Sequence, residues 1–122
     1  MNEMVTTITL DTEGQQTVNI VPEITLEHLQ AEVGGYIEHV ELHENVSMFV
    51  NEDGIMSNLP PNYPATLLAR AFGWDQGSPL LGQVMLTGGA GPEGETLGLG
   101  SQEVDLLTIM IGKVRAAAEV FS

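Results

Sequence analysis

The last part of the chain carries an apolar stripe that is costly to leave in water. Its side chains recur every three or four residues, the spacing of one face of an α-helix, at Val104, Leu107, Ile111, Val114, Ala118 and Phe121. This pattern predicts a helix from Gln102 to about Phe121, with Ser101 as its N-cap. A lone helix cannot bury its own stripe, so the residues before it must build the surface that it covers.

Two pairs of alternating segments can supply that surface. Residues 4–10 alternate with Met4, Thr6, Ile8 and Leu10 on one face, and after a turn at residues 11–14 a second alternation places Val18 and Ile20 together. A strand over residues 36–42 is followed by a second short turn and by residues 46–50, in which apolar side chains stand at every second position. Each pair predicts a β-hairpin.

Two short helices and a fifth strand complete the expected elements. A helix over residues 26–33 has Thr25 as its N-cap and ends at a glycine pair. A second helix is expected over residues 65–72. Pro64 precedes it and favours its start, because the fixed φ of proline suits the first helical turn. The continuous apolar run of residues 80–87 predicts a buried strand.

These elements predict an α+β fold. We expect an antiparallel-rich sheet of four to five strands, with two short helices and one long C-terminal helix packed on one face of it. A chain of 122 residues is long enough to bury one hydrophobic core. No linker divides the sequence, so residues 1–122 are expected to form a single domain.

The charge of the chain is strongly one-sided. Seventeen acidic residues face three basic ones, Arg70, Lys113 and Arg115, and the net charge is −14. Residues 1–69 contain no Lys or Arg at all. Such a field repels nucleic acid and anionic membranes and attracts cationic proteins. We therefore expect a partner protein with a basic surface, and neither direct nucleic-acid binding nor membrane binding.

Cysteine usage and hydropathy bear on the compartment. The chain contains no cysteine, so it has neither a disulfide framework nor a thiolate metal site. The first residues lack the basic and apolar regions of a signal peptide, and no apolar run has the length of a membrane span. These features predict a cytoplasmic protein.

The glycine-rich segment at residues 88–100 resembles nucleotide-binding loops in part. Residues 89–94 match the G-x-G-x-x-G pattern and follow a predicted strand, but the next helix starts several residues too late to meet a pyrophosphate. The same stretch read as a P-loop has Glu95 where the phosphate-binding lysine belongs. We interpret the segment as a mobile connecting loop and expect no cofactor.

Three side chains form the best candidate for a metal site. His39, Glu41 and His43 alternate along one predicted strand, so their side chains would project from one face about 7 Å apart. Two imidazoles and a carboxylate suit Zn²⁺, and His28 is a conceivable fourth ligand. The alternative is a solvent-facing side of an ordinary strand, which we favour.

The sequence offers little for catalysis. No serine lies in the setting of a nucleophile elbow, and no histidine has a spacing that indicates a triad. The turn at residues 51–54 contains acids and an amide beside a glycine, but Phe49 occupies the position of the first ligand of a calcium loop. We expect a protein that is not an enzyme.

Three short segments, in a fixed order, resemble one family. They are residues 29–38 with the motif GGYIE, residues 50–62 with VNEDG and LPPN, and residues 81–88 with LGQV and TG. Together they resemble small domains of unknown function encoded mainly by bacteriophages and related mobile elements. The resemblance covers roughly residues 26–90, implies the origin of an accessory gene, and transfers no catalytic residue.

We therefore predict a non-enzymatic phage or mobile-element accessory protein that binds a host macromolecule in the host cytoplasm, and we expect that macromolecule to be a protein. The expected contact surface is acidic and consists of Glu38, Glu41, Glu44, Glu52 and Asp53. A specific version of this hypothesis is DNA mimicry, in which the carboxylates imitate phosphates and inhibit a DNA-binding protein. The alternatives are a small-ligand or metal-binding protein, and a homodimer formed through the apolar C-terminal helix.

Overall fold

The computed structural model describes residues 3–121 and has an α+β fold, as predicted. Five strands form one antiparallel sheet in the order β2-β1-β5-β4-β3. The elements in chain order are β1 (Val5–Leu10), β2 (Gln16–Val21), α1 (Leu26–Val33), β3 (Ile37–His43), β4 (Val46–Asn51), α2 (Tyr63–Ala71), β5 (Val84–Thr87), α3 (Ser101–Ala118) and the short 3₁₀ helix η1 (Glu119–Phe121).

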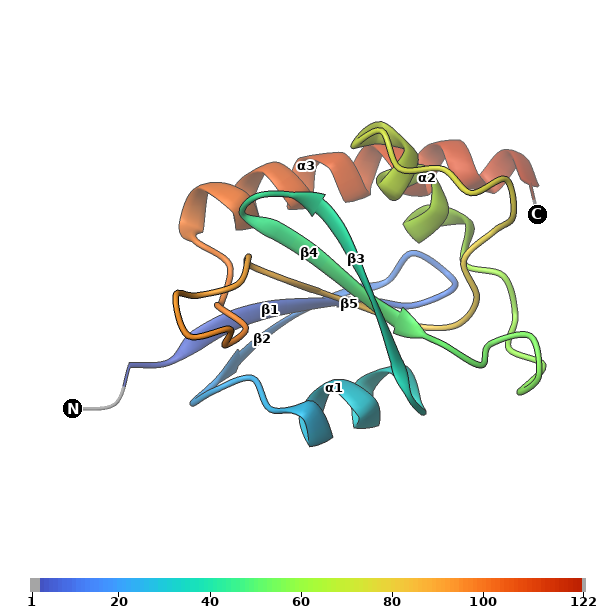
Figure 1. Cartoon of the computed structure of the whole chain (residues 1–122). Coiled ribbons are helices and arrows are strands. Elements are labelled where there is room, and N and C mark those ends of the chain that lie inside the picture. Colours follow the sequence, from blue (N-terminus) through green and yellow to red (C-terminus); the bar gives the residue numbers. More distant parts are fainter. Residues whose placement is uncertain (1–2, 122) are drawn as a thin grey trace.

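The helices lie on both faces of the sheet, which corrects the expectation that they share one face. Helices α2 and α3 cover one side, and α1 covers the other (Figure 1). Alternation along β4 explains why both faces need a cover: Met48 belongs to the core under α2 and α3, whereas Phe49 packs with Leu29 of α1 and with Met85. A strand that is apolar on both sides is stable only when each side is covered.

Helix α3 confirms the predicted apolar stripe. Leu107, Ile111 and Ala118 are buried, and Val104 and Val114 pack against the same core. The predicted cap is wrong: α3 begins at Ser101, and Gly100 is the N-cap without a side-chain hydrogen bond. The side chain of Phe121 lies outside the described residues.

The short helices follow their local signals. Thr25 caps α1 as predicted, because its Oγ1 accepts a hydrogen bond from the His28 N–H at 3.1 Å, and Gly34 ends the helix with φ 82°. Helix α2 starts two residues before the predicted Ala65, because Asn62 is its N-cap and accepts a hydrogen bond from the Ala65 N–H at 2.9 Å.

Residues 88–97 of the glycine-rich segment, which was predicted to be a connecting loop, form a tight hairpin. The Gly88 N–H donates to the Leu97 carbonyl, and the Leu97 N–H donates to the Gly89 carbonyl, both at 2.9 Å. A Cβ atom at Gly89 would overlap the carbonyl oxygen of Glu44. The glycine is therefore needed for close packing against the β3–β4 turn.

Strand β5 is shorter than the predicted run of residues 80–87. Leu80 and Leu81 lie before it and contact the segment that leads into α2, where Leu81 forms a bridge with Pro61.

Among the helices of residues 3–121, none has the length and apolar character that crossing a membrane requires.

Candidate protein-binding surface

The five acids predicted as a contact surface all lie along one edge of the sheet. Strand β3 is an edge strand, and it carries Glu38 and Glu41. Glu44 lies in the turn that leads from β3 to β4. Glu52 and Asp53 directly follow β4, where its last residue pairs with the first residue of β3.

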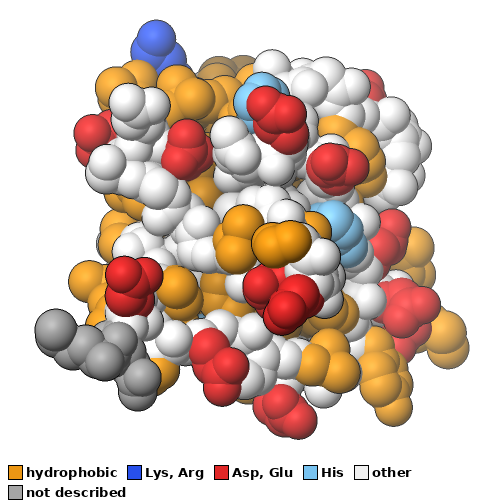
Figure 2. Space-filling view, turned by 60° about the vertical axis from the view of Figure 1, so that its left-hand side comes forward, with side chains coloured by type: hydrophobic (Ala, Val, Ile, Leu, Met, Phe, Trp, Pro, Cys, Tyr) orange, Lys and Arg blue, Asp and Glu red, His pale blue; other side chains and the backbone are white. Residues whose placement is uncertain are grey.

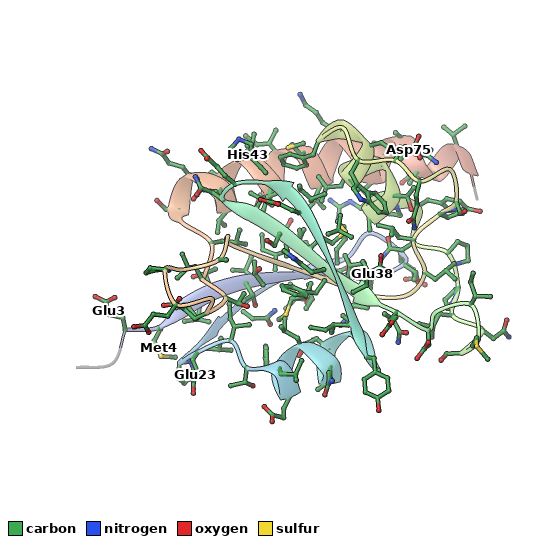
Figure 3. The ribbon with its side chains drawn as sticks, viewed as in Figure 1. Glu3, Met4, Glu23, Glu38, His43 and Asp75 are labelled. Carbon is green, nitrogen blue, oxygen red and sulfur yellow. The ribbon has the colours of Figure 1, made fainter. Side chains whose placement is uncertain are left out.

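These acids do not share one face. Glu38 is on the side of β3 that carries the buried Val40, toward α2 and α3, and Glu41 is on the opposite side. Glu44 lies at the far end of the strand from Glu52. Figure 3 labels Glu38 and His43, which lie near opposite ends of β3. The predicted surface is thus divided, and only Glu38, Glu52 and Asp53 lie at the same end of β3.

Large apolar side chains project at that same end. Ile55 and Met56, in the turn after Asp53, are 84% and 89% exposed. Tyr36, the residue before β3, is 66% exposed. Sequence analysis missed these three residues, because a pattern of apolar letters does not tell which side chains remain uncovered. Exposed apolar side chains grouped among charges are typical of binding surfaces.

The turn that carries Ile55 and Met56 is anchored by hydrogen bonds of the Asn51 side chain. The Asn51 side chain donates from Nδ2 to the Val33 carbonyl at 3.0 Å and accepts at Oδ1 from the Asp53 N–H at 2.7 Å. The Ser57 N–H donates to the Asp53 carbonyl at 2.8 Å. Asn51 therefore ties the turn to the end of α1, and its amide is committed to structure rather than to a calcium ion.

A pocket lies on each side of the turn. One, of about 190 Å³, includes Glu38, Glu52 and Ile55 in its lining. The other, of about 450 Å³, is lined by Gln30, Gly35, Tyr36, Asn51, Asp53 and Ser57. We call Tyr36, Glu38, Glu52, Asp53, Ile55 and Met56 the turn surface.

The cations of the molecule lie elsewhere. Arg70 is on α2, and Lys113 and Arg115 are on α3, so all three belong to the layer on one side of the sheet. Figure 2 shows Asp and Glu side chains spread over the face in view, with the colour of Lys and Arg only at its upper margin. Within residues 3–121, none of the five predicted acids forms an ion pair.

One ion pair joins α2 to the segment that follows it. Arg70 Nε lies 3.3 Å from Asp75 Oδ1, and both side chains are substantially exposed. The pKa of the Asp75 carboxyl is lowered, first because the Gly77 N–H donates a hydrogen bond to it and also because of the nearby Arg70 charge.

The weak candidates for metal ligands, His39, Glu41 and His43, do not form a cluster. The pairing of β3 with β4 shifts register between Glu41 and His43, and this irregularity breaks the alternation that would align His43 with His39. Among residues 3–121, no three His, Asp or Glu side chains lie close enough together to hold a metal ion.

His39 has another partner, which sequence analysis missed. Its Nε2 lies 2.9 Å from Ser47 Oγ, and its ring stacks on Phe49 with centroids 5.0 Å apart. The pair borders a pocket of about 230 Å³ beside the glycine-rich hairpin. Ser47 is only 3% exposed, and no carboxylate among residues 3–121 bonds to His39, so the pair lacks the third member of a catalytic triad.

A family model for a domain of unknown function matches residues 5–112 of the chain. The chain belongs to the DUF3846 family. No curated protein and no solved structure matches it. The DUF3846 match extends well beyond the resemblance at residues 26–90, and it includes the β1–β2 hairpin and most of α3. The whole sheet therefore belongs to the family domain, together with the turn surface.

Proposed function

We propose that the protein acts by binding another protein, without catalysis, and that the turn surface makes the contact. The observation that carries the proposal is the exposure of Ile55 and Met56 beside Glu52 and Asp53. Fully burying an Ile or Met side chain contributes about 1.5–3 kcal/mol, so two such residues can anchor a contact. The carboxylates favour a partner whose surface is basic.

Charge and apolar area have separate roles in this proposal. The acids steer a cationic partner toward the surface and select against anionic ones, an effect that salt weakens. The apolar side chains provide contact area that salt does not weaken. Glu41 and Glu44, farther along the β3 edge, extend the attractive field without joining the anchored contact.

The family resemblance gives the proposal its biological setting. It implies a phage or mobile-element accessory gene, so the partner would be a host protein in the host cytoplasm. DNA mimicry is a narrower form of the same function, in which the basic partner surface is a DNA-binding site. Competition by duplex DNA distinguishes this form from general protein binding.

The test compares variants in a pull-down from host lysate at several salt concentrations. The first variant neutralises Glu38→Gln, Glu52→Gln and Asp53→Asn, and the second carries Ile55→Ser and Met56→Ser. A control with the same change in charge carries Glu23→Gln, Glu27→Gln and Asp105→Asn, all exposed and away from the turn surface. We expect the same partner with the wild type and the control, and its loss with both test variants.

Two outcomes would contradict the proposal. If both test variants retain the partner as well as the wild type does, the turn surface is not the contact. If the control loses the partner as fully as the charge variant does, only net charge matters. Added duplex DNA that releases the partner would support mimicry of DNA.

A further inference from the structure

The two edges of the sheet differ in how they are protected. Strand β3 carries Glu38 and Glu41 and has an irregular register near its end. Charges and irregularities of this kind prevent an edge from pairing with another strand. Strand β2, the opposite edge, has neither: residues 14–22 contain no charged side chain, and β2 pairs with β1 in unbroken register.

The register of the first hairpin shows which backbone groups of β2 are free. The Asp11 N–H donates to the Gln15 carbonyl at 3.1 Å, so these two residues form a hydrogen-bonded pair. Bonded pairs alternate along an antiparallel ladder, so residues 17, 19 and 21 bond to β1. The N–H and C=O groups of Gln16, Val18 and Ile20 therefore point outward from the sheet.

The side chains of Val18 and Ile20 are apolar and exposed, and that of Gln16 is neutral and partly buried. Val18 is 48% exposed and Ile20 is 64% exposed, on the side of the sheet that faces α3. The Gln16 side chain donates from Nε2 to Thr108 Oγ1 at 2.9 Å, which fixes the start of the strand against α3. The nearest acids along the chain, Glu13 and Glu23, lie beyond the two ends of β2.

We propose that β2 pairs with β2 of a second copy of the chain. Because each copy has a net charge of −14, two copies repel each other wherever carboxylates face. The neutral β2 edge is a surface on which they can meet without bringing acids into direct opposition at the centre. Antiparallel pairing about a two-fold axis satisfies the same groups on both copies. The two five-stranded sheets then form one continuous sheet of ten strands.

The pairing has a definite geometry. With the axis near Val18, that residue faces its counterpart, and Gln16 of each copy faces Ile20 of the other. The three outward residues of each strand then make about six intermolecular backbone hydrogen bonds. This dimer does not use α3, whose apolar stripe is already buried against the sheet. Figure 3 shows Glu3 and Glu23 near the end of β2, where they limit how far the pairing extends.

The mass of the purified protein in solution tests the proposal. We expect twice the monomer mass of 13.1 kDa, determined by light scattering after size-exclusion chromatography. Val18→Lys places like charges opposite each other at the axis and should raise the dissociation constant by about tenfold or more. The control Ile109→Lys makes the same kind of change at an exposed position of α3 and should leave the dimer intact.

Amide hydrogen exchange gives a second measurement that does not depend on a variant. The N–H groups of Gln16, Val18 and Ile20 should become protected as the protein concentration rises. A monomer at high concentration, or a dimer that Val18→Lys leaves unchanged, would overturn the proposal. Salt separates this proposal from partner binding: screening of like charges should strengthen the dimer, whereas it should weaken the contact at the turn surface.

Discussion

Asn62 donates its side-chain amide to the carbonyl oxygen of Gly82 at 2.9 Å, and through this contact the start of α2 is joined to the approach to β5. The same Nδ2 donates to the Leu10 carbonyl at the end of β1, at 3.1 Å. Its Oδ1 accepts from the Ala65 N–H and so caps α2. One fully buried side chain thus connects three parts of the chain that are far apart in sequence.

Replacing Asn62 should therefore be among the most damaging single changes. Asn62→Ala leaves two carbonyl groups and one N–H without a partner in the interior, which should lower the free energy of unfolding by roughly 3 kcal/mol or more. Asn62→Asp keeps the cap acceptor but turns a carboxylate toward two carbonyls, so it should not rescue. Urea denaturation measures both, with the exposed Gln102→Ala as a control that changes stability little. An Asn62→Ala protein of wild-type stability would contradict this role.

Two glycine-to-alanine substitutions should have opposite effects. Gly89→Ala places a Cβ against the Glu44 carbonyl oxygen, and the backbone must move to relieve the overlap, at a cost of about 1–3 kcal/mol. Gly112 lies within α3, and a Cβ there would meet no atom within 4 Å. Gly112→Ala should therefore raise stability by about 0.5–1 kcal/mol through helix propensity. Thermal unfolding measures the change in stability that each substitution causes. Two changes of the same sign would contradict the packing argument.

The Asp75 carboxyl should make a small contribution to stability that depends on pH. The folded state lowers its pKa below the ordinary value of 3.8, chiefly through the Gly77 N–H and also through Arg70. The carboxylate is thus favoured on folding, and its contribution is present above the unfolded pKa and lost as the pH falls through the folded pKa. The stability difference between wild type and Asp75→Asn should shrink in acid. Carbon NMR of the carboxyl should give a midpoint below 3.8, and a midpoint at or above it would contradict the contact.

The local elements follow from the sequence because their signals are local. Thr25 and the glycine pair at residues 34–35 bound α1 as predicted, since a cap acceptor and a left-handed residue act within one turn of the helix. The apolar stripe of α3 and the two hairpins were likewise predicted from the spacing of apolar residues alone. The prediction of Ser101 as the N-cap of α3 is wrong, because Gly100 holds that position and no side chain makes a capping hydrogen bond.

The features that local sequence patterns did not predict depend on how the strands pair. Which helix covers which face depends on how β3, β4 and β5 pair, and the contact of His39 with Ser47 depends on the register of β3 with β4. The sequence by itself determined the elements, the single-sign charge and the apolar stripe. Only the tertiary structure decided which side chains remain exposed and which edge stays unprotected, because burial results from contacts between residues far apart in the chain.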